Sequence, residues 1–134
     1  MAVSNIKVVF HSDIKKVWDT VTSLHNYAWR SDLDRIEIKD EKTFVEYTKE
    51  GYATTFTITV TKPCERWEFD MENDNMKGHW TGIFTKEGDE TKLDFTEAAE
   101  AKKLFMKPFV KLYLKKQQKQ YVSDLQKELS NSLN

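Results

Sequence analysis

Hydrophobic and polar side chains alternate along most of this chain, and the period of the alternation predicts its elements. Within residues Val3–Phe10, the apolar residues Ile6, Val8 and Phe10 fall on one face, which predicts an opening strand. His11-Ser12-Asp13 then offers an N-cap, because short oxygen-bearing side chains satisfy the free amides of a first helical turn. A helical spacing of apolar residues follows and predicts a short amphipathic helix from Asp13 to about Leu24. Its apolar positions are Ile14, Val17, Trp18 and Val21.

After an irregular turn over His25–Leu33, the period returns to two. Six runs rich in Val, Ile, Thr and aromatic residues predict strands, and the polar stretches between them favour turns. In one run, Trp67, Phe69 and Met71 oppose charged residues, a pattern typical of a sheet with one dry and one wet face. The six runs are Ile36–Lys39, Thr43–Thr48, Thr54–Lys62, Arg66–Glu72, Met76–Lys86 and Thr91–Ala101.

From about Lys103 to Asn131 apolar residues recur at helical spacing, which predicts one long C-terminal helix that starts near Pro108 or kinks there. No helices alternate with the strands, so the fold class is α+β with a seven-stranded antiparallel sheet. Such a sheet is on the order of 30 Å wide, whereas a helix is about 10–12 Å across. The sheet must therefore curl around the helix. The uncovered apolar surface then either walls a cavity or is filled by its own large side chains.

The order of elements and several short stretches resemble the START-like superfamily (SRPBCC; the helix-grip or pollen-allergen-type fold), with the polyketide cyclase/dehydrase and lipid-transport branch closest. Many relatives place a proline beside the tryptophan, whereas Ala28 and Arg30 flank Trp29 here. The resemblance implies one START-like domain over residues 1–134, with a curved sheet wrapped around the long helix and short helices after the first strand. The stretches are His11-Ser12-Asp13-Ile14-Lys15-Lys16-Val17-Trp18, Asn26-Tyr27-Ala28-Trp29, Gly78-His79-Trp80-Thr81-Gly82, Lys92-Leu93-Asp94-Phe95-Thr96 and Leu104-Phe105-Met106-Lys107-Pro108-Phe109.

The resemblance also implies a pocket between sheet and helix for a small apolar or amphipathic molecule, such as a lipid, a polyketide or a sterol-like compound. Large apolar side chains of the strands, with a few polar residues, are expected to line it. The candidates are Trp29, Phe56, Ile58, Trp67, Phe69, Trp80, Phe84, Phe95, Glu97, Phe109, Tyr113 and Gln117.

Glu97 is the most informative polar candidate, because counting by twos along its strand places it on the core-facing side. A buried carboxylate must be paired, protonated or placed at a wet cavity mouth. Glu97 is thus a ligand anchor or an acid/base group with a raised pKa, or it pairs with a lysine or a tyrosine hydroxyl. Tyr113, Gln117 and Tyr121 lie at near-helical spacing and either line the pocket or close the core. Trp29 either gates the cavity or pins a loop onto the core.

Composition excludes several other classes of protein. The 134 residues carry 21 basic and 22 acidic side chains, which argues against a dedicated nucleic-acid binder. The single cysteine, Cys64, excludes an internal disulfide framework, and the three histidines show no metal-ligand spacing. No glycine-rich phosphate loop is present, so neither a metal nor another cofactor is expected. The chain shows neither a membrane-spanning run nor a signal peptide, and we expect a cytoplasmic location.

Three functions remain, led by transport or sensing of a small hydrophobic ligand without catalysis. The first alternative is a polyketide cyclase/dehydrase-type enzyme, in which Glu97 and either His79 or Tyr113 act as acid/base groups. The second is a protein-interaction or chaperone-assisting module, although no obligate protein partner is predicted. The lysines of the final helix admit transient contact with an anionic membrane, with a solvated outer face of a core helix as the plainer interpretation.

Overall fold

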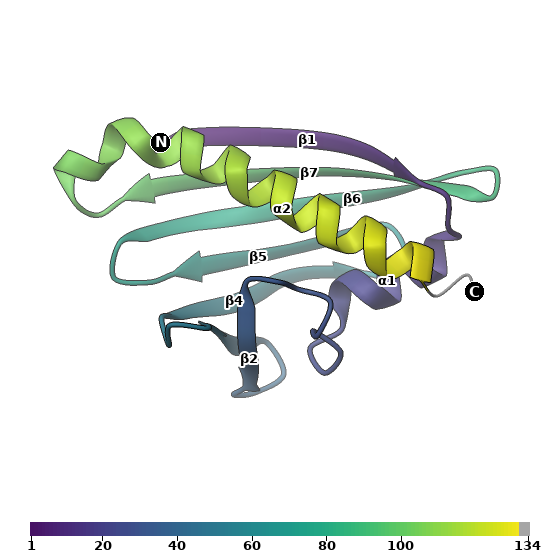
Figure 1. The fold of residues 1–134 in the computed structure, drawn as a ribbon, viewed down its shortest axis with the longest axis horizontal. Helices are drawn as coiled ribbons and strands as arrows, with labels where there is room; N and C mark the ends of the chain where they lie inside the picture. The colour runs from purple at the N-terminus through teal and green to yellow at the C-terminus, as the bar shows by residue number, and fades with distance from the viewer. Residues whose placement is uncertain (132–134) are drawn as a thin grey trace.

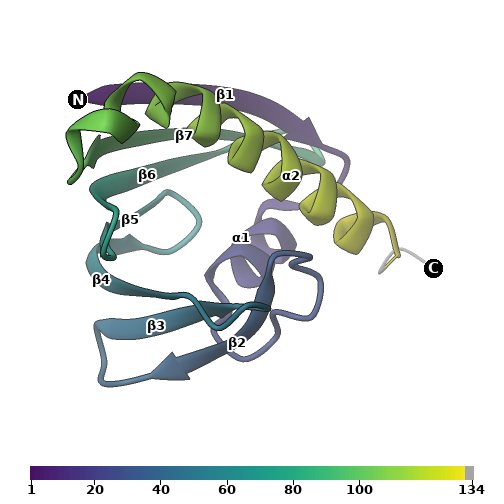
Figure 2. The same cartoon turned by 60° about the vertical axis from the view of Figure 1, so that its left-hand side comes forward.

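A seven-stranded antiparallel sheet curves around one long helix (Figures 1 and 2). The computed structural model describes residues 1–131. Its strands are β1 (Ala2–Phe10), β2 (Leu33–Ile38), β3 (Thr43–Thr48), β4 (Ala53–Lys62), β5 (Arg66–Glu72), β6 (Met76–Glu87) and β7 (Glu90–Ala101). Its helices are α1 (Ile14–Thr22), the short 3-10 helix η1 (Leu104–Phe109) and α2 (Val110–Asn131). The predicted α+β helix-grip fold is confirmed.

The strands follow the spatial order β1-β7-β6-β5-β4-β3-β2. Strands β2 to β7 therefore each pair with the next strand in sequence, whereas β1 pairs with β7. Register shifts occur between Ile58 and Val60 on β4 and between Leu33 and Arg35 on β2. Such bulges bend a strand and increase its twist. They fall in the half of the sheet that turns back toward α1 and α2 in Figure 2, which is the curl that the narrow helix requires.

Two helical boundaries differ from the expectation. The Asp13 carboxylate caps α1 by accepting from the amides of Lys15 and Lys16, but α1 ends at Thr22 rather than near Leu24. The predicted long helix is divided, because η1 contains Pro108 and regular α-helix begins only at Val110. A proline has no N–H to donate and its ring crowds the preceding turn, so the α-helix starts just after it. No helix of residues 1–131 is long and apolar enough to cross a membrane.

The concave face of the sheet carries a continuous set of aromatic rings. Phe44 stacks on Phe56 at 4.9 Å between ring centroids, and Phe69 stacks on Trp80 at 5.0 Å. The Trp80 indole lies over Gly82, where an added Cβ would overlap the ring. Because Trp80 is only 6% exposed and packs against neighbouring rings, it has little freedom to move aside. Gly82 thus provides the space that keeps the ring set in place.

We predict that Gly82→Ala lowers the free energy of unfolding by about 1–3 kcal/mol, the usual cost of overpacking a core. The sign is diagnostic, since alanine is otherwise favoured over glycine inside a strand by roughly 0.5–1 kcal/mol. Urea unfolding measures the change. Thr85→Ala, at an exposed position of the same strand, is the matched control and should stay within about 0.5 kcal/mol of the parent. An unchanged or more stable Gly82→Ala protein would contradict this packing.

Candidate functional site

A cavity of about 230 Å³ lies between the concave face of the sheet, α2 and the segment that connects α1 to β2. Seven apolar side chains of the sheet form most of its wall. They are Phe44, Phe56, Trp67, Phe69, Met71, Trp80 and Phe95. These rings pack edge-to-face or stacked on one another, with centroids between 4.9 and 6.5 Å apart for the pairs that involve Phe44 and Phe69. They therefore line the space and leave its middle open.

Most of the predicted lining residues do face this cavity. The structure brings together Trp29, Phe56, Trp67, Phe69, Trp80, Phe95, Glu97, Tyr113 and Gln117. Trp29 packs edge-on against Tyr121 at 5.5 Å, and its indole N–H donates to the Asn26 carbonyl at 3.1 Å. These contacts hold Trp29 as a fixed part of the wall and tie its loop to α2.

Three predicted lining residues lie elsewhere, which corrects the expectation. Phe84 packs edge-on against Trp18 at 4.9 Å, because α1 covers that end of the sheet. Ile58 is half-buried against the core at the β4 bulge, where the register shift removes it from the cavity wall. Phe109 is 64% exposed, since it ends η1 and precedes the part of α2 that packs on the sheet.

Glu97 occupies the inner face of β7, where its cross-strand neighbours are Ser4 and Trp80. It is only 9% exposed and lines the cavity. The Ser4 hydroxyl donates to Gln118 Oε1 at 2.8 Å and so does not serve Glu97. Within residues 1–131, no hydrogen bond or ion pair satisfies the Glu97 carboxyl, so the predicted lysine or tyrosine partner is absent there. Burial and the nearby Glu46 carboxylate raise its pKa to about 7, against the opposing charge of Arg30.

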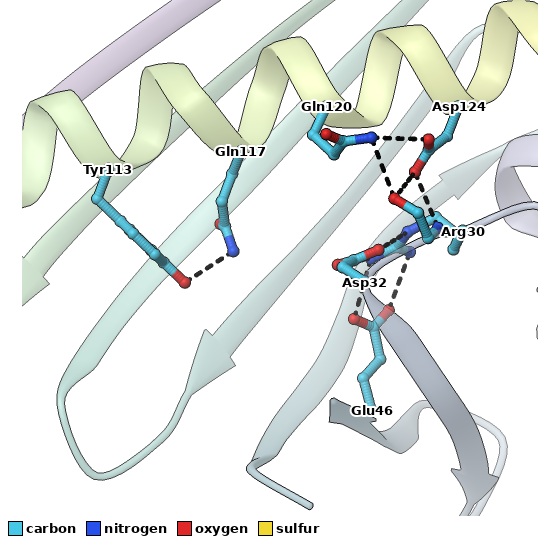
Figure 3. A network of polar contacts seen from close by, with 8 residues as sticks. Arg30, Asp32, Glu46, Tyr113, Gln117, Gln120 and Asp124 are labelled. Atoms are coloured by element: carbon cyan, nitrogen blue, oxygen red, sulfur yellow. Dashed lines mark hydrogen bonds and ion pairs between the residues drawn. The ribbon is translucent and has the colours of Figure 1, made fainter. Parts of the chain in front are cut away.

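Arg30, which lines the polar part of the cavity, is already bonded to two other carboxylates. Arg30 donates to both oxygens of Asp32 at 3.1 Å and to both oxygens of Glu46 at 3.4 Å (Figure 3). Its guanidinium also lies 5.2 Å from the centre of the Tyr121 ring, a cation–π arrangement. Burial lowers the pKa of Arg30, but the charges of Glu46 and Asp32 outweigh that effect and raise it. Arg30 is thus committed to this ion pair rather than to Glu97.

A second polar cluster ties the connecting segment to α2. The amide and hydroxyl of Ser31 donate to Asp124 Oδ2 at 2.9 and 2.8 Å. Gln120 Nε2 donates to Asp124 Oδ1 at 2.9 Å and to the Ser31 hydroxyl at 3.0 Å (Figure 3). Burial raises the pKa of Asp124, but these donors favour its carboxylate and lower the pKa overall. The cluster fixes the loop that carries Arg30 against the helix.

Two further tyrosines shape the polar part of the wall. The Tyr113 hydroxyl accepts from Gln117 Nε2 at 2.7 Å, and its side chain is 46% exposed, so it lies at the cavity mouth (Figure 3). Tyr121 lies deeper, between Trp29 and Phe95, and burial raises its pKa. Its hydroxyl has no hydrogen-bond partner among residues 1–131. Glu97 and Tyr121 therefore both present unsatisfied polar groups to the cavity.

His79 does not belong to this site, which corrects its role as an acid/base candidate. It lies on the outer face of the sheet, where Nε2 contacts Glu68 and Nδ1 contacts Asp70, each at 2.7 Å. Adjacent positions of a strand face opposite sides, so the inward placement of Trp80 requires His79 to point outward.

Within the described part of the chain no group of His, Cys, Asp and Glu side chains is arranged to hold a metal ion.

Arg30 and Glu46 line the cavity and Asp124 fixes the loop beside it, but none of the three is among the predicted site residues. The sequence does mark Arg30 as unusual, because Ala28 and Arg30 flank Trp29 where many relatives place a proline. The Arg30–Glu46 pair joins a loop to β3 over sixteen positions of sequence, and no local spacing predicts such a contact.

Solved structures with this fold are similar over nearly the whole chain. A START superfamily protein from Mycobacterium smegmatis has a TM-score of 0.85 at 15% identity, covering 98% of this chain and 99% of that one. A conserved protein from Geobacillus kaustophilus has a TM-score of 0.83 at 15% identity, covering 97% and 96%. The di-domain ARO/CYC BexL from the BE-7585A biosynthetic pathway has a TM-score of 0.84 at 12% identity, covering 100% of this chain and 48% of that one.

These low identities establish the shared fold alone. Comparison with curated proteins gave no match. The sequence model of one family, described as polyketide cyclase / dehydrase and lipid transport, matches residues 1–130. This chain, with its helix-grip fold, belongs to the polyketide cyclase / dehydrase and lipid transport family.

Proposed function

We propose that this protein binds one small, mostly apolar molecule that carries a polar group, in the cavity between the sheet and α2. The observation that supports this most is the unpartnered carboxyl of Glu97 inside an aromatic wall. The Glu97 carboxyl faces the open space of the cavity, so its oxygens are available to a ligand. A ligand that hydrogen-bonds Glu97 forms that bond in a site of low dielectric and buries its own apolar surface against the rings.

The volume limits the size of the enclosed part of the ligand. An apolar protein cavity of about 150 Å³ accepts benzene. The cavity of about 230 Å³ therefore suits a group of one or two fused rings, or an acyl segment of similar volume. The rest of a longer molecule would extend out of the cavity past Tyr113, which is 46% exposed at the mouth.

The polar end of the ligand is expected to meet Glu97 and the Tyr121 hydroxyl. A carboxyl with a pKa of about 7 is partly protonated at neutral pH, so it either donates to a carbonyl or accepts from a hydroxyl. The hydroxyl of Tyr121 offers one further donor. The ligand class is thus a hydroxylated or carbonyl-bearing apolar molecule, such as a phenol, a polyketide or a lipid.

A cyclase- or dehydratase-type enzyme is the second candidate function. The observation that favours it is the same carboxyl, because a general acid/base works best with a pKa near the operating pH. Tyr113 is the remaining second group, since its hydroxyl lies at the mouth of the cavity and is oriented by Gln117. Turnover of a poly-β-carbonyl substrate that stops in Glu97→Gln, while the substrate still binds, would favour the enzyme over the carrier.

We predict that Ala99→Leu lowers the affinity for 2-naphthol at least about tenfold, because Ala99 faces the cavity beside Glu97 and the larger side chain occupies its space. Fluorescence titration measures the dissociation constant, and circular dichroism verifies the fold of each variant. Ala98→Leu is the matched control, since Ala98 lies on the opposite face of β7 and its substitution should leave binding unchanged. Equal loss in both variants, or in neither, would contradict a ligand in this cavity.

A matched pair of probes tests the anchor. We predict that 2-naphthol binds about 5- to 30-fold more tightly than naphthalene, the range expected for one hydrogen bond worth roughly 1–2 kcal/mol to a buried polar group. In Glu97→Leu the naphthalene affinity should persist while the preference for 2-naphthol disappears. A preference that survives in Glu97→Leu would show that another group anchors the hydroxyl.

Protonation of Glu97 also gives a pH-dependent stability. Its pKa is raised to about 7 in the folded state from 4.5, so the folded chain retains a proton that the unfolded chain loses between these values. Stability therefore falls as pH rises from about 4.5 to about 7. We predict that Glu97→Gln is about 3 kcal/mol more stable relative to the parent at pH 8 than at pH 4. His79 contributes equally to the pH dependence of both proteins, so it cancels when the free energy of unfolding of the parent is subtracted from that of the variant. If this difference in free energy does not vary with pH, the pKa of Glu97 is not raised.

A further inference from the structure

A group of large apolar side chains lies exposed on η1 and the first turn of α2. Leu104 is 79% exposed, Phe105 74%, Phe109 64% and Leu112 71%. We call these four residues the η1 surface. Isolated apolar residues are common on protein surfaces, but four large ones within nine positions of sequence mark a site of interaction. In Figure 1 the segment before α2, which is η1, extends beyond the ends of β1 and β7.

The segment of sequence that contains the η1 surface carries only positive charges. Residues 101–123 contain seven lysines and no acidic residue, although the whole chain has a net charge of −1. Lys102 pairs with Glu72 at 2.7 Å and Lys103 donates to Asn75 at 3.2 Å, which anchors the base of the segment. Lys107, Lys111 and Lys116 form no ion pair within residues 1–131. Glu100 lies with Leu104 and Lys107 at one surface hollow, but the segment that carries the apolar side chains is itself basic throughout and attracts an anionic surface.

Helical spacing places apolar and basic groups together. Leu112 and Lys116 lie four residues apart on α2, which puts them on one face of the helix, and Phe109 is the last residue of η1 just before it. Tyr113, four residues after Phe109, lines the mouth of the cavity. The η1 surface therefore borders the opening through which a ligand would enter.

We propose that the η1 surface docks on an anionic lipid membrane, with its four apolar side chains inserted among the acyl chains and the surrounding lysines on the headgroups. Shallow apolar insertion together with a basic rim is what holds peripheral helices at such an interface. A protein partner would also cover the apolar group, but the absence of acidic residues over 23 positions complements a uniformly anionic surface best. The proposal does not depend on what the cavity binds.

Sedimentation with lipid vesicles tests this docking on the full chain. Vesicles of phosphatidylcholine with 30% phosphatidylglycerol (about one anionic lipid in three) should bind the protein at least about tenfold more tightly than pure phosphatidylcholine vesicles. Raising the salt from about 0.1 to about 0.5 M should weaken the binding, because the Debye length shortens. The double variant Phe105→Gln/Leu112→Gln should lose at least about tenfold in affinity for the anionic vesicles.

Ile38→Gln/Ile83→Gln is the matched control, because both isoleucines are exposed on the sheet, at 45% and 38%, away from η1. It should bind anionic vesicles like the parent. Circular dichroism and 2-naphthol binding should be unchanged in both double variants, so a failure of the cavity function is separable from a failure of docking. The proposal is overturned if the parent shows no preference for anionic vesicles, if both double variants bind alike, or if the η1 surface captures a protein and no vesicle.

Discussion

One helix is too narrow to cover the apolar face of a seven-stranded sheet, and the rest of the structure follows from that mismatch. The bulges in β2 and β4 bend the far half of the sheet back toward the helices, which brings the concave face around α2. At one end α1 fills the interior through the contact of Trp18 with Phe84. At the other end the stacked rings brace one another along the wall, and about 230 Å³ remains open.

At the polar end of the cavity, three carboxyl groups lie near the guanidinium of Arg30. Arg30 is the buried cation, and its donors are taken by Asp32 and Glu46. Glu97 is left beside them with a raised pKa and with no partner in the described part of the chain. The Glu97 carboxyl faces the open space of the cavity and adds nothing to the packing of the rings, which is why we propose it as the anchor of a ligand.

Alternation and helical spacing were enough to predict the fold, since the position of Glu97 beside Phe95 and Ala99 on the inner face follows from a period of two. They failed where the backbone departs from regular geometry. The prediction that Phe109 lines the pocket is wrong, because Phe109 ends η1 and its side chain is 64% exposed. The Arg30–Glu46 pair escaped prediction because it joins a loop to a distant strand, and its geometry depends on the curl of the whole sheet.

Diffraction from crystals held under xenon pressure tests the enclosed space most directly, because xenon enters apolar cavities that are large enough and otherwise dry. The account predicts a xenon site bounded by Phe69, Trp80 and Phe95, with the wall side chains in their present positions. An interior without xenon, in which those rings have moved together and filled the space, would contradict it.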